Sequence, residues 1–244
     1  MKRLFLLLLL TSFYGIAQQQ YVIEKDIHYY SDSLDKKDIY RDSQCTLDIY
    51  YPKNANNFAT VVWFHGGGLT SGNKEIPTAL LEKGFAVIGV GYRFSPKVKA
   101  PVYIEDAAAA IAWAFQHIGK YGGNTDLIFL SGHSAGGYLT MMVGLDKKYL
   151  SKYSIDANKI AGNIPFSGHT ITHFTVRKEK GMNDIQPLID EYAPLFFARP
   201  DASPLVLITG DPELELLGRY EENAYMWRMM KLAGHKRTTL YKLE

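Results

Sequence analysis

The sequence has only one cysteine, Cys45, among its 244 residues. A single thiol cannot form an internal disulfide. No group of cysteines and histidines has the spacing of a zinc site, so we expect no metal. Cys45 lies in a strand-like stretch far from the motifs described below, which favours a buried structural thiol over a nucleophile.

The sequence also lacks an excess of charge of either sign. Its formal net charge is +2, and it contains no block of like charges, no low-complexity tract and no internal repeat. This balance gives no reason to expect nucleic acid or an acidic polymer as a partner. With 47% hydrophobic and 21% charged residues, the chain is typical of a globular protein and long enough for one domain with a substantial core.

The apolar run near the N-terminus, residues 4–10, is too short for a membrane-spanning helix, which needs roughly 20 apolar residues. Lys2 and Arg3 precede this run, and a small-x-small site follows it at residues 15–17. The pattern predicts a signal peptide over residues 1–17 and a secreted or periplasmic protein without membrane attachment after cleavage. A membrane anchor is the alternative interpretation.

Apolar patterning predicts strands that alternate with helices along most of the chain. The predicted strands are residues 21–30, 44–51, 59–64, 85–90, 126–130, 160–166, 205–209 and 238–243. The predicted helices are residues 76–83, 104–118, 138–145 and 216–233. This order predicts an α/β fold: a mostly parallel sheet, two antiparallel strands at its N-terminal edge, and helices on both faces. Residues 169–192 have weak periodicity and are expected to form a small cap segment.

A G-x-S-x-G motif, Gly132-His133-Ser134-Ala135-Gly136, follows one predicted strand and leads into a predicted helix. This context is typical of a nucleophile elbow, in which a strained turn exposes the serine hydroxyl at the carboxyl end of a strand. The two flanking glycines are required where side chains would collide between strand and helix. We therefore predict Ser134 as a nucleophile, and we do not expect His133, at a variable motif position, to be its base.

A second motif, His65-Gly66-Gly67-Gly68, directly follows the predicted strand 59–64. The backbone N–H groups of Gly67 and Gly68, with that of Ala135, can stabilise the oxyanion of a tetrahedral intermediate. We expect His65 to brace this loop. A phosphate-binding loop is disfavoured because the spacing and the lysine of a Walker motif are absent. Both motifs follow predicted strands, so they are expected to meet at one edge of the sheet.

The two motifs together resemble the α/β-hydrolase superfamily, in particular the hormone-sensitive-lipase-like esterases and the bacterial feruloyl and acetylxylan esterases. Further similar segments are Thr46–Pro52, Gly91–Arg93 with Pro96, and Tyr121–Asn124. The resemblance implies one α/β-hydrolase domain over residues 18–244. It also implies hydrolysis of small-molecule or polysaccharide-linked esters through an acyl-enzyme, without metal or organic cofactor. An exported peptidase or amidase, or a non-catalytic binding domain, is the alternative. The oligomeric state is left open.

The acid of a catalytic triad is expected directly after the predicted strand 205–209. We choose Asp211 and keep Glu213 as the alternative, because both lie within a few residues of that strand's end. The family order is serine, then acid, then histidine.

The base histidine is the missing part of this pattern. His235 is the one histidine that follows the acid, but it precedes the last predicted strand and so belongs at the opposite edge of the sheet. His173 or His169, in the predicted cap, are the remaining candidates. We therefore expect the histidine, and a final covering helix, to lie beyond residue 244. On this hypothesis the chain is a truncated and catalytically incomplete esterase.

Overall fold

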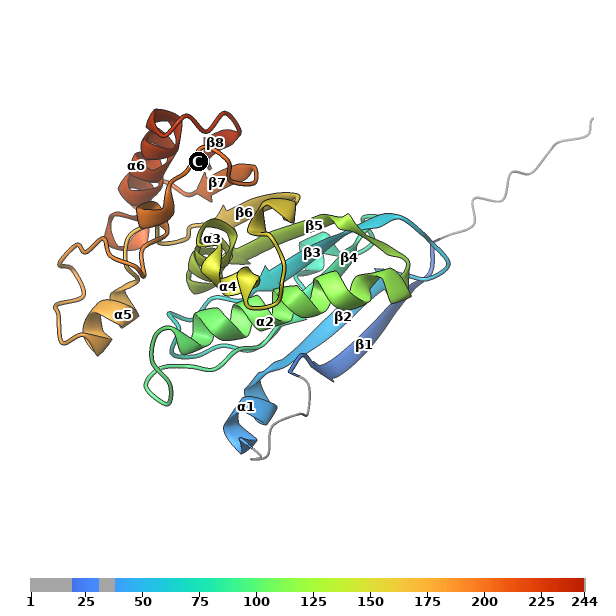
Figure 1. Cartoon of the computed structure of the whole chain (residues 1–244). Helices are drawn as coiled ribbons and strands as arrows, with labels where there is room; N and C mark the ends of the chain where they lie inside the picture. The colour runs from blue at the N-terminus through green and yellow to red at the C-terminus, as the bar shows by residue number, and fades with distance from the viewer. Residues whose placement is uncertain (1–18, 31–37, 244) are drawn as a thin grey trace, which may run out of the picture.

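A computed structural model describes residues 19–30 and 38–243 of the chain. The predicted signal peptide, residues 1–17, lies outside the described residues. The described strands form one eight-stranded sheet in the order β1-β2-β4-β3-β5-β6-β7-β8 (Figure 1). No helix among the described residues is long and apolar enough to cross a membrane.

From β4 onward, α-helices separate consecutive strands. The strands are β1 Tyr21–His28, β2 Thr46–Pro52, β3 Phe58–Phe64, β4 Ala86–Val90, β5 Gly123–His133, β6 Gly162–Phe166, β7 Leu205–Thr209 and β8 Thr238–Lys242. The α-helices are α1 Ile39–Gln44, α2 Val102–His117, α3 Ala135–Leu145, α4 Lys148–Ser151, α5 Phe174–Glu179 and α6 Arg219–Leu232. Short 3-10 turns are η1 Thr78–Leu80, η2 Ile118–Tyr121, η3 Ala157–Lys159, η4 Pro194–Phe197 and η5 Leu216–Gly218.

The strand directions confirm the predicted sheet. Strand β2 pairs antiparallel with both β1 and β4, and every other neighbouring pair is parallel. The parallel strands β3, β5, β6 and β7 therefore have their carboxyl ends at one edge, where ligands of such sheets bind.

One face of the sheet carries the core. Leu130, Asn163 and Leu205 lie opposite one another on β5, β6 and β7, and all three are buried. Helices α2 and α3 pack over this face in one cluster, and α6 packs with α3 over β7 in a second one. Helix α2 is rich in alanine, so it lies close to its neighbours, and it runs along the sheet in Figure 1.

The other face of the sheet presents apolar side chains that are only half-buried. We call these side chains the outer strip: Val61, Trp63, Phe129, Ile164, Phe166, Val206 and Ile208. The strip is continuous across the strands, because Val61 lies opposite Phe129 and the ring of Trp63 is 6.0 Å from that of Phe166.

Two predicted helices differ from the structure. The helix expected over residues 76–83 is wrong, because only Thr78–Leu80 forms a 3-10 turn. Pro77 disfavours helical backbone at the residue before it. The helix expected from residue 216 begins only at Arg219, because Leu217 and Gly218 have positive φ angles of 57° and 68°.

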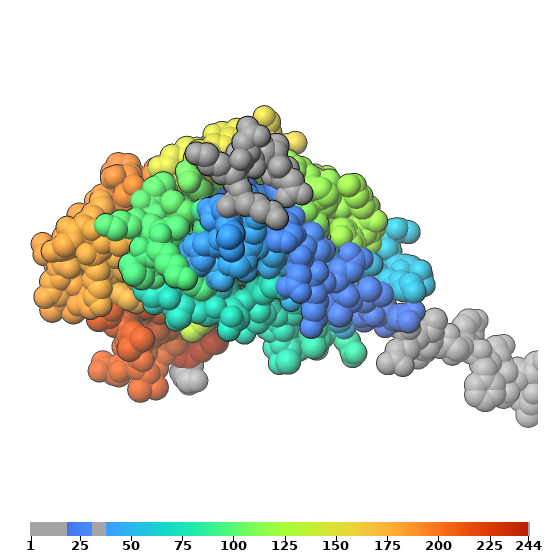
Figure 2. All heavy atoms as spheres, turned by 90° about the horizontal axis from the view of Figure 1, so that it is seen from below, coloured from blue at the N-terminus to red at the C-terminus, as the bar shows by residue number. Residues whose placement is uncertain are grey.

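The segment 169–192 contains α5 and lies against the glycine loop and the start of α2. The hydroxyl of Thr175 donates to the carbonyl oxygen of Gly68 at 2.5 Å, and the amide of Ala100 donates to Glu179 at 2.9 Å. Figure 2 shows this segment in orange beside the green segment around residue 100. The segment therefore lies next to one of the two predicted catalytic motifs.

Candidate active site

Ser134 connects β5 to α3 in a strained turn. Its backbone angles are φ 55° and ψ −111°, which L-residues rarely adopt. Its amide donates to the carbonyl oxygen of Phe166, at the end of β6, at 2.8 Å. The residue is partly exposed, so the hydroxyl is presented at the carboxyl edge of the sheet. The strand–turn–helix context predicted for the motif is confirmed.

The motif glycines allow β3 and α3 to pass close to one another. A β-carbon built on Gly136 would lie 1.9 Å from the carbonyl oxygen of Phe64, and one on Gly132 would lie 2.6 Å from it. Both distances are far below van der Waals contact, so any side chain would push the end of β3 away from Ser134. The predicted steric reason for the two glycines is confirmed.

The glycine loop after β3 lies beside Ser134. A β-carbon on Gly66 would be 3.7 Å from that of Ser134. Gly67 and Gly68 follow with φ angles of 113° and 64°, and the amide of neither donates a hydrogen bond to another described residue. Ala135 is the first residue of α3, where amides lack a partner within the helix. Backbone amides without partners, arranged in this way, are able to donate to an oxyanion.

His65 braces the glycine loop, as predicted. Its ring stacks on that of Tyr92 at 4.4 Å, and its Nδ1–H donates to the carbonyl oxygen of Gly66 at 2.6 Å. The hydroxyl of Tyr92 donates to the carbonyl oxygen of His65 at 2.8 Å. Burial lowers the pKa of His65, so the ring is a neutral structural part of the loop.

Arg219, which the sequence did not indicate, contacts the predicted nucleophile. Its Nη1 donates to Ser134 Oγ at 3.1 Å, and its Nη2 donates to His169 Nε2 at 3.0 Å. His169 in turn places Nδ1 3.0 Å from a carboxylate oxygen of Glu222. Arginine has no acceptor, so His169 carries its proton on Nδ1 and donates it to Glu222. The three side chains form a continuous buried chain that ends at Ser134.

Burial dominates the protonation of this chain. It lowers the pKa of His169, and this effect outweighs the opposing effect of the hydrogen bond that His169 donates to Glu222. Burial also lowers the pKa of Arg219. A guanidinium nevertheless stays protonated in proteins. The site therefore contains a fixed positive charge beside Ser134, a neutral imidazole behind it and a carboxylate at the far end.

The predicted triad acids lie away from this chain. Asp211 accepts from the amide of Glu213 at 2.9 Å, and Glu213 itself is exposed. Glu215 is the carboxylate directly under the end of β7, where it accepts from the amide of Gly210 at 2.6 Å and from the hydroxyls of Thr209 and Ser167. Burial alone would raise the pKa of Glu215, but these hydrogen bonds lower it.

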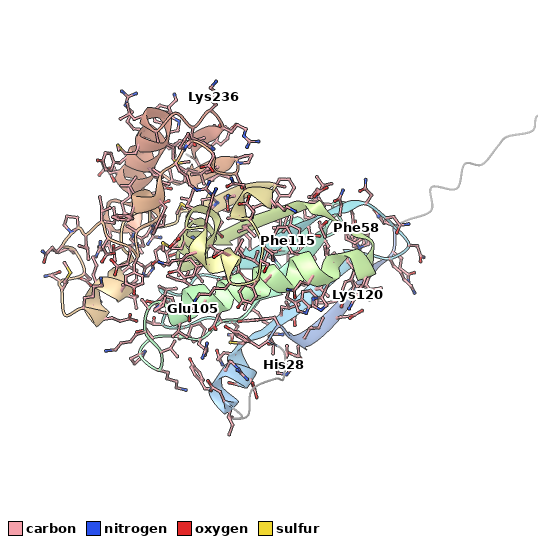
Figure 3. All side chains as sticks on the ribbon, in the orientation of Figure 1. His28, Phe58, Glu105, Phe115, Lys120 and Lys236 are labelled. Atoms are coloured by element: carbon pink, nitrogen blue, oxygen red, sulfur yellow. The ribbon has the colours of Figure 1, made fainter. Side chains whose placement is uncertain are left out.

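The histidine candidates are not brought to Ser134. His235 lies in the turn before β8, next to Lys236, which is labelled in Figure 3. Its two ring nitrogens contact Thr238 Oγ1 at 2.6 Å and the carbonyl oxygen of Ala202 at 2.9 Å. His173 is fully buried, and its Nδ1 accepts from the amide of Thr175 at 3.2 Å. Within residues 19–30 and 38–243, no histidine nitrogen forms a hydrogen bond with Ser134 Oγ.

No cluster of three or more histidine, cysteine, aspartate or glutamate side chains in the described part of the chain has a metal-binding arrangement. The lone Cys45 is buried, as expected, and burial raises the pKa of its thiol. A thiol of this kind is a structural side chain rather than a nucleophile.

Comparison with known proteins identifies esterases as relatives. The chain is 31% identical over 174 residues to the probable carboxylic ester hydrolase LipM of Mycobacterium tuberculosis. The aligned residues cover 63% of this chain and 39% of LipM. It is 31% identical over 105 residues to an acetyl esterase of Salmonella paratyphi B, covering 41% of this chain and 32% of that protein. The matches thus span about a third of the length of these relatives.

Solved structures show the same fold. A truncated form of a carbohydrate esterase from gut microbiota superposes with a TM-score of 0.73 at 20% identity, covering 92% of this chain and 88% of the other. Esterase B from Lactobacillus rhamnosis with a bound inhibitor superposes with a TM-score of 0.69 at 20% identity, covering 91% and 76%. The predicted α/β-hydrolase fold is confirmed.

The family comparison covers both motifs and the chain that contains Arg219. Residues 47–232 match the BD-FAE family, which is more than half of the sequence. The protein therefore belongs to the BD-FAE family.

Proposed function

We propose that this protein is a serine carboxylic ester hydrolase. Ser134 attacks the ester carbonyl carbon, and the amides of Gly67, Gly68 and Ala135 stabilise the oxyanion that forms. The alcohol leaves, and water then hydrolyses the acyl-enzyme. The observation that carries this proposal is the strained turn at Ser134 beside a glycine loop with free amides, in a chain whose relatives are named esterases.

The substrate is proposed to be a short-chain or carbohydrate-linked ester met outside the cytoplasm. The N-terminal pattern of residues 1–17 supports export, and a carbohydrate esterase is among the similar folds. Residues 169–192, which contact the glycine loop, act as a small cap beside the substrate in this proposal. N-terminal sequencing of the protein recovered from outside the cytoplasm tests export, since an intact Met1 there contradicts cleavage.

The rest of the triad stays a prediction. Asp211 is the proposed acid and Glu213 its alternative, although Glu215 makes the more extensive contacts at the end of β7. The base histidine likewise stays a prediction. Without a base, the oxyanion hole and binding alone accelerate a reaction by ~10³–10⁴ over water.

A fluorophosphonate probe tests the nucleophile directly. We expect the wild-type chain to be labelled at one serine, located at Ser134 by peptide mass spectrometry, and Ser134→Ala to lose the label. Hydrolysis of p-nitrophenyl acetate, acetylated xylan and peptide p-nitroanilides then separates an esterase from a peptidase or amidase. Labelling that persists in Ser134→Ala contradicts the proposal.

A non-catalytic binding domain is the second candidate. The favouring observation is that Ser134 Oγ contacts a guanidinium and, among the described residues, no histidine. This candidate predicts no fluorophosphonate labelling and no difference between the wild-type chain and Ser134→Ala.

A further inference from the structure

We propose that Arg219 is a catalytic residue that activates Ser134, and that His169 and Glu222 are positioning residues that hold its guanidinium at the nucleophile. The inference rests on the proposed function, because it assigns a further role at the same site. Its direct observation is the 3.1 Å hydrogen bond from Arg219 Nη1 to Ser134 Oγ.

The guanidinium is held from several sides. Arg219 is the first residue of α6, and its carbonyl oxygen accepts from the side chain of Asn223 at 2.8 Å. At the other end of the side chain, Nη2 donates to His169, whose Nδ1 is fixed by Glu222. Arg219 is 3% exposed and His169 is fully buried, so little water competes for these hydrogen bonds. The contact with Ser134 is therefore preorganised rather than a mobile surface contact.

The direction of the hydrogen bond matters for the chemistry. Ser134 Oγ accepts from Arg219, so the hydroxyl proton remains free to be donated to a base or to solvent. As that proton leaves, negative charge develops on Oγ at 3.1 Å from a permanent cation that is itself buried. A preorganised cation at the position where charge develops lowers the cost of forming the anion.

Several other ionisable groups surround Arg219, and none replaces it at Oγ. They are His133 at the end of β5, His169, His173 and Arg177 of the segment 169–192, Glu215 after β7, and Glu222 of α6. The pKa values of the three histidines are lowered, chiefly by burial, and that of Glu215 is lowered as well. Above pH 7 the three histidines and Glu215 therefore keep constant charge.

The test measures phosphonylation of Ser134 between pH 7 and 10.5 in the wild-type chain, Arg219→Gln and Arg219→Lys. In this reaction the Oγ–P bond forms, the P–F bond breaks, fluoride leaves and the hydroxyl proton passes to solvent or buffer. We expect Arg219→Gln to react ~10- to 100-fold more slowly at pH 7.5, with its rate rising at higher pH than in the wild-type chain. Arg219→Lys keeps the cation, so it should retain part of the wild-type rate. Its rate should also rise at a lower pH than that of Arg219→Gln.

Arg199→Gln is the matched control, because it removes a guanidinium whose side chain is 16% exposed and which donates to the carbonyl oxygen of Leu145 and to Asn158, not to Ser134. We expect its rate and pH profile to equal those of the wild-type chain. Glu222→Gln weakens the hydrogen bond that orients His169. Its rate of phosphonylation should lie between those of the wild-type chain and Arg219→Gln. Added guanidinium chloride at millimolar concentration should restore part of the rate of Arg219→Ala.

Two results overturn the inference in different ways. If the wild-type chain is labelled at Ser134, but Arg219→Gln reacts at the same rate with the same pH profile, Arg219 has no role and the proposed function stands. If the wild-type chain is not labelled, neither an activated Ser134 nor the proposed function survives. Circular dichroism and thermal melting establish that each variant is folded before its rate is compared.

Discussion

At the scale of single residues, Gly136 offers the sharpest test of the turn that carries Ser134. We expect Gly136→Ala to destabilise the fold by about 3 kcal/mol or more, because its β-carbon would lie 1.9 Å from the carbonyl oxygen of Phe64. That oxygen belongs to the backbone and cannot rotate away. Urea unfolding followed by circular dichroism measures the free energy of unfolding.

Gly119→Ala is the control for this substitution. A β-carbon on Gly119 meets no atom within 4 Å, and its backbone has no positive φ angle. Its free energy of unfolding should be unchanged or higher by less than about 1 kcal/mol. Equal stability of the two variants would show that β3 and α3 do not approach as closely as described.

The sequence was sufficient for the part of the site that is built from neighbouring residues. Ser134 and its glycines form one pentapeptide, and Gly66–Gly68 directly follow a strand, so local pattern revealed both motifs. Arg219 was missed because its contact with Ser134 joins residues 85 positions apart. The one local signal was Gly218, whose positive φ angle ends the preceding turn and makes Arg219 the first residue of α6.

At the scale of elements, a buried ion pair fixes α2 to the segment after β4. Asp106, within α2, is fully buried and lies 2.6 Å from Arg93 Nη2. It also accepts from Arg93 Nε at 2.9 Å and from the hydroxyl of Tyr30 at 2.7 Å. These contacts join the residues that follow the edge strand β1, the β4–α2 connection and α2.

Asp106→Asn should therefore be strongly destabilising. The substitution removes the buried counter-charge of Arg93, whose side chain is 14% exposed, and leaves only the half-exposed Asp38 at 3.4 Å, which costs about 3 kcal/mol. The control is Lys152→Ala, which removes an ion pair with Glu105 whose side chains are 54% and 35% exposed. That loss should stay below about 1 kcal/mol. Chemical unfolding of both variants measures the loss in free energy of unfolding. If Asp106→Asn loses as little as Lys152→Ala, the Arg93–Asp106 ion pair does not stabilise the fold as described.

Elements with strong apolar patterning were predicted well, and those set by tertiary contact were not. Strand β7 was predicted with its observed bounds, because its apolar run is continuous. The segment 76–83 was mistaken for a helix because its apolar residues have helical spacing. The chain just before this segment packs closely on β4, since the carbonyl oxygen of Glu75 lies 2.2 Å from a β-carbon built on Gly89. Such a contact depends on packing and leaves no local signal.

At the scale of the whole molecule, buried neutral histidines make stability depend on pH. Burial lowers the pKa values of His65, His169 and His173 in the folded protein. Between those pKa values and the ordinary value near 6.5, the unfolded chain binds more protons than the folded one. The free energy of unfolding must then fall as pH falls below about 6.5, by at most about 1.4 kcal/mol per pH unit for each histidine.

His173→Asn tests this dependence, since asparagine can also cap the first turn of α5. We expect the free energy of unfolding of the wild-type chain to decrease from pH 7.5 to pH 5.5, and the decrease to be smaller in His173→Asn. Urea titrations at both pH values measure it. Identical pH dependence in the two proteins would mean that His173 is not held neutral by the fold.

The overall architecture was the most predictable level, because it follows from the order of strands and helices. Two early strands without an intervening long helix indicated the antiparallel edge, and the later alternation indicated parallel strands. The order of strands and helices along the chain does not show which face of the sheet each helix covers. Leu130 and Leu205 share the helix-covered face through the register of three strands, and a register of this kind is set only when the sheet assembles.

The outer strip has a consequence for the protein in concentrated solution. Water that wets Trp63, Phe166 and their neighbours is released when any apolar surface covers them, with a gain of about 25 cal/mol for each Å². Sulfate and phosphate salts strengthen this gain, whereas urea weakens it. The choice of salt during purification and crystallisation therefore acts on contacts made through this side of the sheet.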